Sequence, residues 1–143
     1  MKKLNYILTF LGGAVALFAL QAFTGHIPFE KYILVHEKDI AKQQPGPHKG
    51  GGNTISYPFF EGTKDFKMAF RKRILKPGSA IGYHLQETDE IYYILSGEGE
   101  MQMSGKSFPV TTGDAVLTRP GSSHGIKPAG NMDLTLMIVY ALH

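Results

Sequence analysis

Short alternating segments separated by turn residues are the feature that most restricts how this sequence can fold. From Ile55 onward, side chains favoured in β-strands alternate with polar ones in short runs, and glycine-containing turns separate the runs. Glycine makes up 17 of the 143 residues, well above its usual share of about 7%. We therefore predict an all-β chain, most simply a single-domain jelly-roll β-barrel. The predicted strands span residues 55–61, 66–75, 79–85, 90–95, 100–103, 107–111, 115–118, 124–128 and 134–142.

Residues 1–25 have the pattern of a secretory signal peptide. Lys2 and Lys3 precede an uncharged, mostly apolar run over residues 4–23, and the small residues Ala22 and Gly25 follow at its end. The alternative is an uncleaved anchor, because the run approaches the roughly 20 residues that span a bilayer. We expect a periplasmic or secreted protein, attached to the inner membrane only if the segment is retained. The two lysines supply part of the formal net charge of +3, which gives no reason to expect a nucleic-acid partner.

Two regions follow the signal-like segment. Residues 26–54 are predicted to contain one strand, over residues 31–36, and then a loop. Residues 45–52, with the sequence PGPHKGGG, are too rich in glycine and proline for a helix or a central strand. Residues 55–143 form the predicted barrel, where Pro58 restricts the first strand to a sheet edge. The sequence contains no cysteine, which excludes disulfides, thiolate nucleophiles and cysteine zinc sites.

Potential metal ligands gather between residues 84 and 90. His84 and Gln86 are two residues apart, so an extended strand places both side chains on one face. Residues 87–89 form a polar break, and Glu90 opens the next strand. If the chain reverses at this break, Glu90 returns beside His84 and Gln86. An imidazole, an amide oxygen and a carboxylate form a set that a divalent metal can use, and His124 is a fourth candidate.

The spacing of these residues resembles the two motifs of the cupin superfamily. The first motif is matched by Gly78, His84, Gln86, Glu90 and Gly97, and the second by Gly113, Gly121 and His124. Gln86 stands where many cupins have a second histidine. Arg119 and Pro128 depart from the second motif, where proline and asparagine are usual. The resemblance covers roughly residues 66–141 and is closest to small single-domain bacterial cupins, some of them related to oxalate decarboxylase.

This resemblance implies a cupin jelly-roll barrel that binds one divalent transition metal, such as Mn, Fe, Zn or Ni, at a set of four residues. The implied ligands are His84, Gln86, Glu90 and His124. Two imidazoles and a carboxylate suit such ions and leave coordination positions open. One carboxylate against a dication leaves a positive site, which should attract small anions that chelate through two oxygens.

Each implied ligand has a structural alternative. The histidines would then be ordinary buried, hydrogen-bonded side chains, and Gln86 would be a hydrogen-bond donor near the metal. Glu90 would form a salt bridge with Arg71 or Arg73. These two arginines share one face of the predicted strand 66–75, and a barrel strand must turn one face inward. We therefore also consider them as a substrate-binding clamp for a carboxylate, with an outward, solvated face as the alternative.

Two further residues are candidates for catalysis. Tyr92 has the same strand alternation as Glu90 and should face inward, where its hydroxyl would donate to a metal-bound substrate. His48 lies in the glycine-rich loop and would act as acid or base if that loop folds over the mouth of the barrel. The alternatives are that Tyr92 is simply part of the wall and that His48 is solvated.

Two classes of function follow from these features. The first is a metal-dependent enzyme of the oxygenase, decarboxylase or isomerase type, acting on a small carboxylated or hydroxylated compound. The second is a module that binds a metal and a small ligand without turnover. The first strand and the aromatic residues near it also predict a homodimer, as is common in similar cupins.

Overall fold

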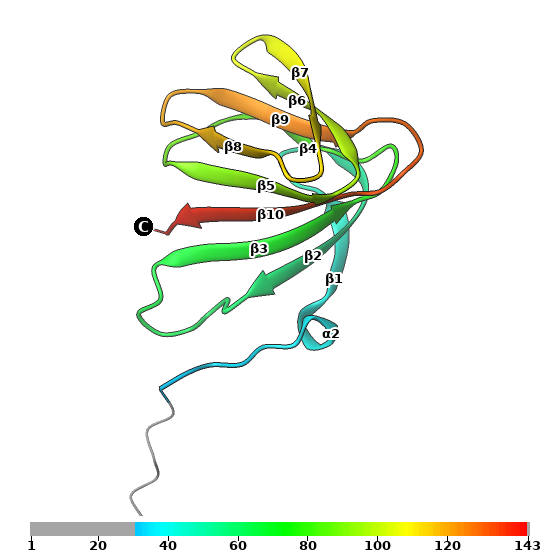
Figure 1. Ribbon diagram of the computed structural model, residues 1–143. Helices are drawn as coiled ribbons and strands as arrows, with labels where there is room; N and C mark the ends of the chain where they lie inside the picture. The colour runs from blue at the N-terminus through cyan, green and yellow to red at the C-terminus, as the bar shows by residue number, and fades with distance from the viewer. Residues whose placement is uncertain (1–30, 143) are drawn as a thin grey trace, which may run out of the picture. The chain divides into compact units, whose positions relative to one another are not determined.

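The computed structural model describes residues 31–142 (Figure 1). The chain divides into two units, Met1–Ile33 and Leu34–His143, and the fold described below belongs to the second. The predicted signal or anchor, residues 1–25, lies outside the described residues. Among residues 31–142, no helix has the length and apolar character needed to cross a membrane.

Within the described part of the second unit, a single short helix precedes a series of β-strands. The elements are α2 (Glu37–Ile40), β1 (Lys42–Gly46), β2 (Gly51–Phe59), β3 (Met68–Leu75), β4 (Ile81–Leu85), β5 (Glu90–Ser96), β6 (Glu98–Met103), β7 (Lys106–Thr111), β8 (Ala115–Thr118), β9 (Ser123–Pro128) and β10 (Leu134–Ala141). The prediction of an all-β chain is therefore confirmed.

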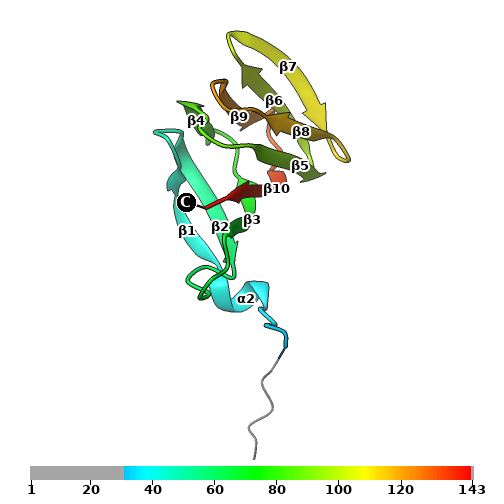
Figure 2. The same ribbon diagram turned by 90° about the vertical axis from the view of Figure 1, so that its left-hand side faces the viewer.

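The strands form two antiparallel sheets. One sheet has six strands in the order β1-β2-β3-β10-β5-β8, and the other has four in the order β4-β9-β6-β7 (Figures 1 and 2). Two facing sheets agree with the predicted jelly roll, but the hydrogen-bonded ladders do not join the sheets into a closed barrel. The chain passes from one sheet to the other at turns such as Gly97 and Gly113, whose φ angles of +90° and +94° suit glycine. Each such crossing interrupts the ladder.

The region before β3 differs from its prediction. Residues 31–36 form no strand, and α2 follows them directly. The predicted loop over residues 45–52 lies in a β-hairpin, in which β1 and β2 are joined by a turn at residues 47–50. β1 is an edge strand, so Pro45 is tolerated there although it donates no hydrogen bond. β2 is not an edge strand, but its pairing with β1 ends at Ser56, and Pro58 lies beyond that point.

The two sheets bury an apolar core between their inner faces. On β5 and β10, buried and more exposed residues alternate, as expected for strands with one face turned inward. Burying each large aliphatic side chain contributes about 1.5–3 kcal/mol. The core consists of Leu75, Ile81, Tyr92, Ile94, Met101, Val110, Ile126, Leu134, Leu136 and Ile138. Three buried polar residues, Gln86, Glu90 and His124, lie off this core and belong to the site described next.

Candidate metal centre

The candidate ligands come from both sheets. His84 on β4 and His124 on β9 are direct cross-strand partners in the four-stranded sheet. Glu90 is the first residue of β5, which belongs to the six-stranded sheet. The polar break at residues 87–89 therefore does not form a hairpin but carries the chain from one sheet to the other. Glu90 reaches the histidines across the interior.

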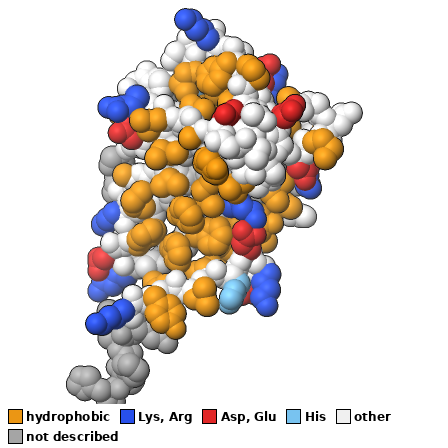
Figure 3. Space-filling model, viewed as in Figure 1, with side chains coloured by type: hydrophobic (Ala, Val, Ile, Leu, Met, Phe, Trp, Pro, Cys, Tyr) orange, Lys and Arg blue, Asp and Glu red, His pale blue; other side chains and the backbone are white. Residues whose placement is uncertain are grey.

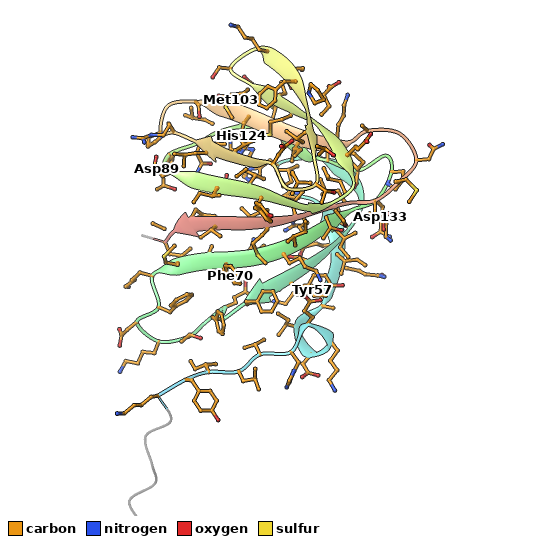
Figure 4. All side chains as sticks on the ribbon, viewed as in Figure 1. Tyr57, Phe70, Asp89, Met103, His124 and Asp133 are labelled. Carbon is orange, nitrogen blue, oxygen red and sulfur yellow. The ribbon has the colours of Figure 1, made fainter. Side chains whose placement is uncertain are left out.

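The structure brings His84, Glu90 and His124 together. One potential ligand atom from each residue lies within 4.8 Å of the other two. The Nε2 atom of His124 is 3.2 Å from Oε2 of Glu90, and the two imidazole centroids are 4.4 Å apart. Figure 4 shows His124 near Met103, its cross-strand partner on β6. Two imidazoles and one carboxylate in this arrangement fit a divalent transition metal.

Unpartnered polar atoms mark the same place. Glu90 is 6% exposed and His124 is fully buried, yet Oε2 of Glu90 and Nδ1 of His124 have no hydrogen-bond partner. A buried acceptor without a donor costs about 1–3 kcal/mol, and more when it is charged. A cation next to this carboxylate would remove that cost, so the residues present fit a bound metal ion.

His84 has its ring orientation fixed by the backbone. Its Nδ1 atom is 2.8 Å from the carbonyl oxygen of Gly82, so Nδ1 carries the proton and donates. The lone pair is then on Nε2, which is the atom available for a metal. A hydrogen bond of this kind from the far ring nitrogen is the usual way in which proteins orient histidine ligands.

Gln86 lines the same cavity as His84 and Glu90, but the distances do not show whether it would bind the metal. It follows β4 directly, is 8% exposed, and its amide nitrogen donates to Oγ1 of Thr88 at 3.3 Å. The side-chain oxygen is the atom that Gln86 would offer to a metal. Both predicted roles, as a ligand and as a neighbour of the ligands, are compatible with this placement.

Tyr92 contacts the centre from the interior. Its side chain is 1% exposed, and its hydroxyl lies 3.0 Å from Nε2 of His124. Burial, followed by the nearby negative charge of Glu90, raises the pKa of Tyr92 well above its usual value of 10.0. The phenol therefore stays protonated near neutral pH and can act as a hydrogen-bond donor.

A cavity of about 290 Å³ lies beside the ligands. Its volume is near the lower limit for small-molecule sites, so it suits a small ligand. Sequence reasoning missed several lining residues, including Tyr140, although Tyr140 has the same alternation on its strand as the inward Leu136 and Ile138. The lining consists of His48, His84, Leu85, Gln86, Glu87, Thr88, Glu90, Tyr140, Ala141 and Leu142.

His48 lies at the tip of the β1–β2 hairpin and covers one side of His84. The two rings are parallel, with centroids 3.5 Å apart and an interplanar angle of 1°. Partial burial, and then the proximity of His84, lowers the pKa of His48. His48 and its neighbour Lys49 both have positive φ angles, +53° and +64°. Such backbone costs roughly 1–3 kcal/mol for each non-glycine residue.

Arg73 points inward but is bound to neutral acceptors. It is 1% exposed, and its two Nη atoms donate to Thr54 at 2.9 Å and to Ser56 at 3.4 Å. Gln44, with its amide oxygen turned toward the guanidinium, accepts from both Nη atoms at 3.0 and 2.9 Å. Burial, and then Arg71, lowers the pKa of Arg73. Arg73 is not among the residues that line the cavity, so its binding of a ligand carboxylate stays a prediction.

The predicted alternative of a Glu90–arginine salt bridge does not occur among the described residues. Arg71 lies 3.7 Å from Glu61 at the molecular surface, and Glu90 lies next to His124. In the polar break, Asp89 forms a salt bridge with Arg119 at 3.1 Å. Within residues 31–142, the carboxylate of Glu90 therefore has no lysine or arginine at ion-pair distance.

Comparison with known proteins gives relatives by sequence and by structure. The sequence profile of the cupin domain matches residues 72–140. An oxalate-binding protein of Thermotoga maritima is 33% identical over 114 residues, which cover 77% of this chain and 94% of the relative. A crystal structure of a predicted oxalate decarboxylase from the same organism is also 33% identical, with a TM-score of 0.68, and the match covers 78% of this chain and all of that chain.

More distant structures share the fold alone. A putative sugar phosphate isomerase from Acidithiobacillus ferrooxidans is 20% identical, with a TM-score of 0.66, over 77% of this chain and 75% of that chain. A polyketide cyclase from Streptomyces resistomycificus is 19% identical with the same TM-score, over 78% and 80% of the two chains. The different names of these proteins show that the fold does not determine the reaction.

Proposed function

The chain belongs to the cupin superfamily, and from this we propose that it binds one divalent transition metal through His84, Glu90 and His124 and holds a small anionic carboxylate beside it. The observation that carries the proposal is the convergence of the buried carboxylate of Glu90 with two imidazoles. Their ligand atoms lie within 4.8 Å of one another, and Oε2 of Glu90, 3.2 Å from Nε2 of His124, makes no hydrogen bond among the described residues. Gln86 would add a neutral oxygen as a fourth ligand, one that an incoming substrate can displace. Mn, Fe, Zn and Ni all accept such a ligand set.

Charge supports an anionic ligand. A dication next to the single carboxylate of Glu90 leaves about one positive charge at the centre. Arg73 adds a buried positive charge on β3, although it does not line the cavity. The relative named as an oxalate-binding protein makes a small dicarboxylate such as oxalate the first ligand to test.

We favour an enzyme of the decarboxylase, oxygenase or isomerase type. When bound, the metal would supply Lewis acidity and, in the oxygenase case, a binding position for dioxygen. Within the chain, His48 at the cavity and Tyr92 behind His124 are the groups that can hold or move a proton. Leu85 and Leu142 contribute apolar surface to the cavity.

A binding module without turnover is the second candidate. Tyr92 does not line the cavity, and its hydroxyl is already paired with His124. His48 is then the only one of the two predicted catalytic residues at the cavity surface. The placement of Tyr92 is the observation that supports this second candidate, and the name of the relative also refers to binding.

The test is to purify the protein from its native host and measure its metal content by elemental analysis. We expect about one transition metal per chain, and a loss of metal in the single variants His84→Ala and His124→Ala. Surface-exposed His36→Ala is the matched control and should retain the metal. Equal metal content in all four proteins would contradict the assignment. Oxalate should then bind to the metal-loaded protein only, and NMR of the oxalate solution would separate turnover from simple binding.

Export and dimer formation are further parts of the proposal. Export is tested by cell fractionation and by determining the N-terminus of the mature protein, which would begin near Gly25 if the signal is cleaved.

Hydrophobic side chains gather over the region of β3, β10 and β5 (Figure 3). On the outward face of β5 and β8, Ile91, Tyr93 and Leu117 are each 43–50% exposed. We take this face as the dimer surface, and sedimentation of wild type against Tyr93→Lys tests it.

A further inference from the structure

The hairpin formed by β1 and β2 supports one of the proposed metal ligands, and we infer that His48 is a positioning residue that fixes the plane of the His84 imidazole. The inference rests on the metal site proposed above. The two rings are parallel at 3.5 Å. A parallel ring at this distance blocks rotation of His84 about its Cβ–Cγ bond. The plane of the His84 ring, which has a ligand atom within 4.8 Å of those of Glu90 and His124, is thus held fixed.

The backbone at the hairpin tip supports a role for the side chain of His48. His48 and Lys49 have φ angles of +53° and +64°, values at which Asn and Gly are usual in turns of this kind. The amide of Gly50 donates to the carbonyl of Pro47 at 3.0 Å and closes the turn. A non-glycine residue held at a positive φ gives reason to ask whether its side chain has a role at a nearby site. Both residues are exposed, but the ring of His48 stacks on that of His84.

The tip of the hairpin is attached to the strand that carries His84. The amide of Gly82 donates to the carbonyl of Pro47 at 3.0 Å, and the carbonyl of Gly82 accepts from Nδ1 of His84 at 2.8 Å. One residue therefore links the turn to the ligand. The contact leaves no space for side chains, because a Cβ atom at Gly82 would lie 2.0 Å from the carbonyl oxygen of His48.

The hairpin is also fixed further along its length. The guanidinium of Arg73 on β3 binds Thr54 on β2 at 2.9 Å and the amide oxygen of Gln44 on β1 at 2.9–3.0 Å. Thr54 in turn donates to the carbonyl of Gln44 at 2.9 Å. Since both strands are tied to the interior by a buried side chain, His48 stands on a supported element and not on a free loop.

The test measures how tightly Co²⁺, added alone, binds to the metal-free full chain of the wild type and of three variants. Affinity is measured by titration, and the ligand geometry is monitored by the visible spectrum of the bound ion. His48→Phe keeps a flat ring, His48→Leu keeps apolar bulk without the ring plane, and His48→Ala removes both. We expect His48→Phe to bind Co²⁺ nearly as tightly as wild type, and the Leu and Ala variants to bind about 10-fold more weakly with an altered spectrum, the size expected for a residue that orients a ligand. Lys49→Gly, which relaxes the same turn without touching His84, should bind like wild type.

Other results would overturn the inference. If His48→Phe binds as weakly as His48→Leu, an imidazole nitrogen and not the ring plane is what matters. If Lys49→Gly shows the same loss, the effect belongs to the turn. Wild-type affinity in every His48 variant also contradicts the role, and the Phe and Leu variants decide the question if the Ala variant does not fold. A wild-type chain that binds no Co²⁺ would instead contradict the metal site itself.

Discussion

The two ends of the space between the sheets differ in their chemistry, although the same strands supply both. Along β5, the inward side chains change from Glu90 to Tyr92 to Ile94. Along β9, His124 is followed on the inner side by Ile126. One end is thus polar and contains unpartnered buried atoms, whereas the other end is formed by side chains that need no partner.

This difference separates stability from function. At the apolar end, Ile94, Met101 and Leu136 are completely buried, and each contributes through removal of its surface from water. Arg73 is the polar exception at that end: its Nη atoms are bound to hydroxyl and amide oxygens, whereas its buried Nε has no partner. At the polar end, Glu90 retains an oxygen without a donor. The chain tolerates that cost, which is expected of a ligand site and not of a packing core.

Replacing the carboxylate should give the largest effect on metal binding. In Glu90→Leu the only anionic ligand is lost, so we expect metal affinity to fall by more than about 100-fold, given that loss of outer residues alone costs 10–100-fold. The metal-free protein should be equally stable or more stable by about 1–3 kcal/mol, because an unpartnered buried acceptor is removed. Calorimetric metal titration and urea unfolding measure the two quantities.

The isosteric Glu90→Gln variant is the control for this experiment. It removes the negative charge but keeps the shape, so its metal affinity should also fall. A metal-free Glu90→Leu protein several kcal/mol less stable than wild type would contradict the separation of stability from function, because the polar end would then carry folding energy.

A truncation at the apolar end should have the opposite pattern. Leu136→Ala is expected to lower the free energy of unfolding by about 2–5 kcal/mol through lost burial and a residual cavity. It should still bind about one metal per chain, because the cross-strand partners of Leu136 are Arg73 and Ile94, neither of which is a proposed ligand. Ile138→Val, a smaller change on the same strand, should cost only about 0.5–1.5 kcal/mol. Loss of metal from folded Leu136→Ala would show that the two ends are coupled.

Much of this fold could be predicted from the sequence because most strands are marked by local patterns. Alternation and turn residues placed β3 to β10 within a few residues of their observed bounds. The segment 31–36 misled this reasoning, since apolar residues there suggest a strand but nothing pairs with them in the described structure. Of the β1–β2 hairpin, only the part of β2 from Ile55 onward was predicted, for the converse reason. Its glycines make it look like a loop, yet they permit close contact with Ala80 and Gly82, which are distant in sequence.

The candidate centre was predictable in its residues but not in its surroundings. The resemblance to the two cupin motifs led to the expectation that His84, Glu90 and His124 meet, and their ligand atoms lie within 4.8 Å of one another. The stacking of His48 on His84 depends on the turn that positions the hairpin tip, and a local pattern does not contain that contact. The partners of Arg73 were likewise not predictable, because they lie on β1 and β2, where no pairing had been expected for β1.

Tyr92 stands between the two ends, and its hydroxyl should contribute a modest amount to stability. In Tyr92→Phe the bond to Nε2 of His124 is lost, so we expect the free energy of unfolding to fall by about 1 kcal/mol near pH 8. Metal binding should persist, since all three proposed ligands remain. The matched control is Tyr93→Phe, because Tyr93 lies next to Tyr92 but points outward and is 43% exposed.

The dependence of stability on alkaline pH gives a second test of the Tyr92 hydroxyl. The pKa of Tyr92 is raised in the folded protein by burial and then by Glu90, whereas in the unfolded chain it is near 10.0. The unfolded chain therefore loses this proton first, and stability falls as pH rises above about 10. Tyr92→Phe lacks that titration, so its stability should fall less between pH 9 and 11, as measured by urea unfolding, than that of wild type or Tyr93→Phe. Parallel curves for all three proteins would mean that the Tyr92 hydroxyl is not held in the interior, and the boundary between the polar and apolar ends would then lie elsewhere.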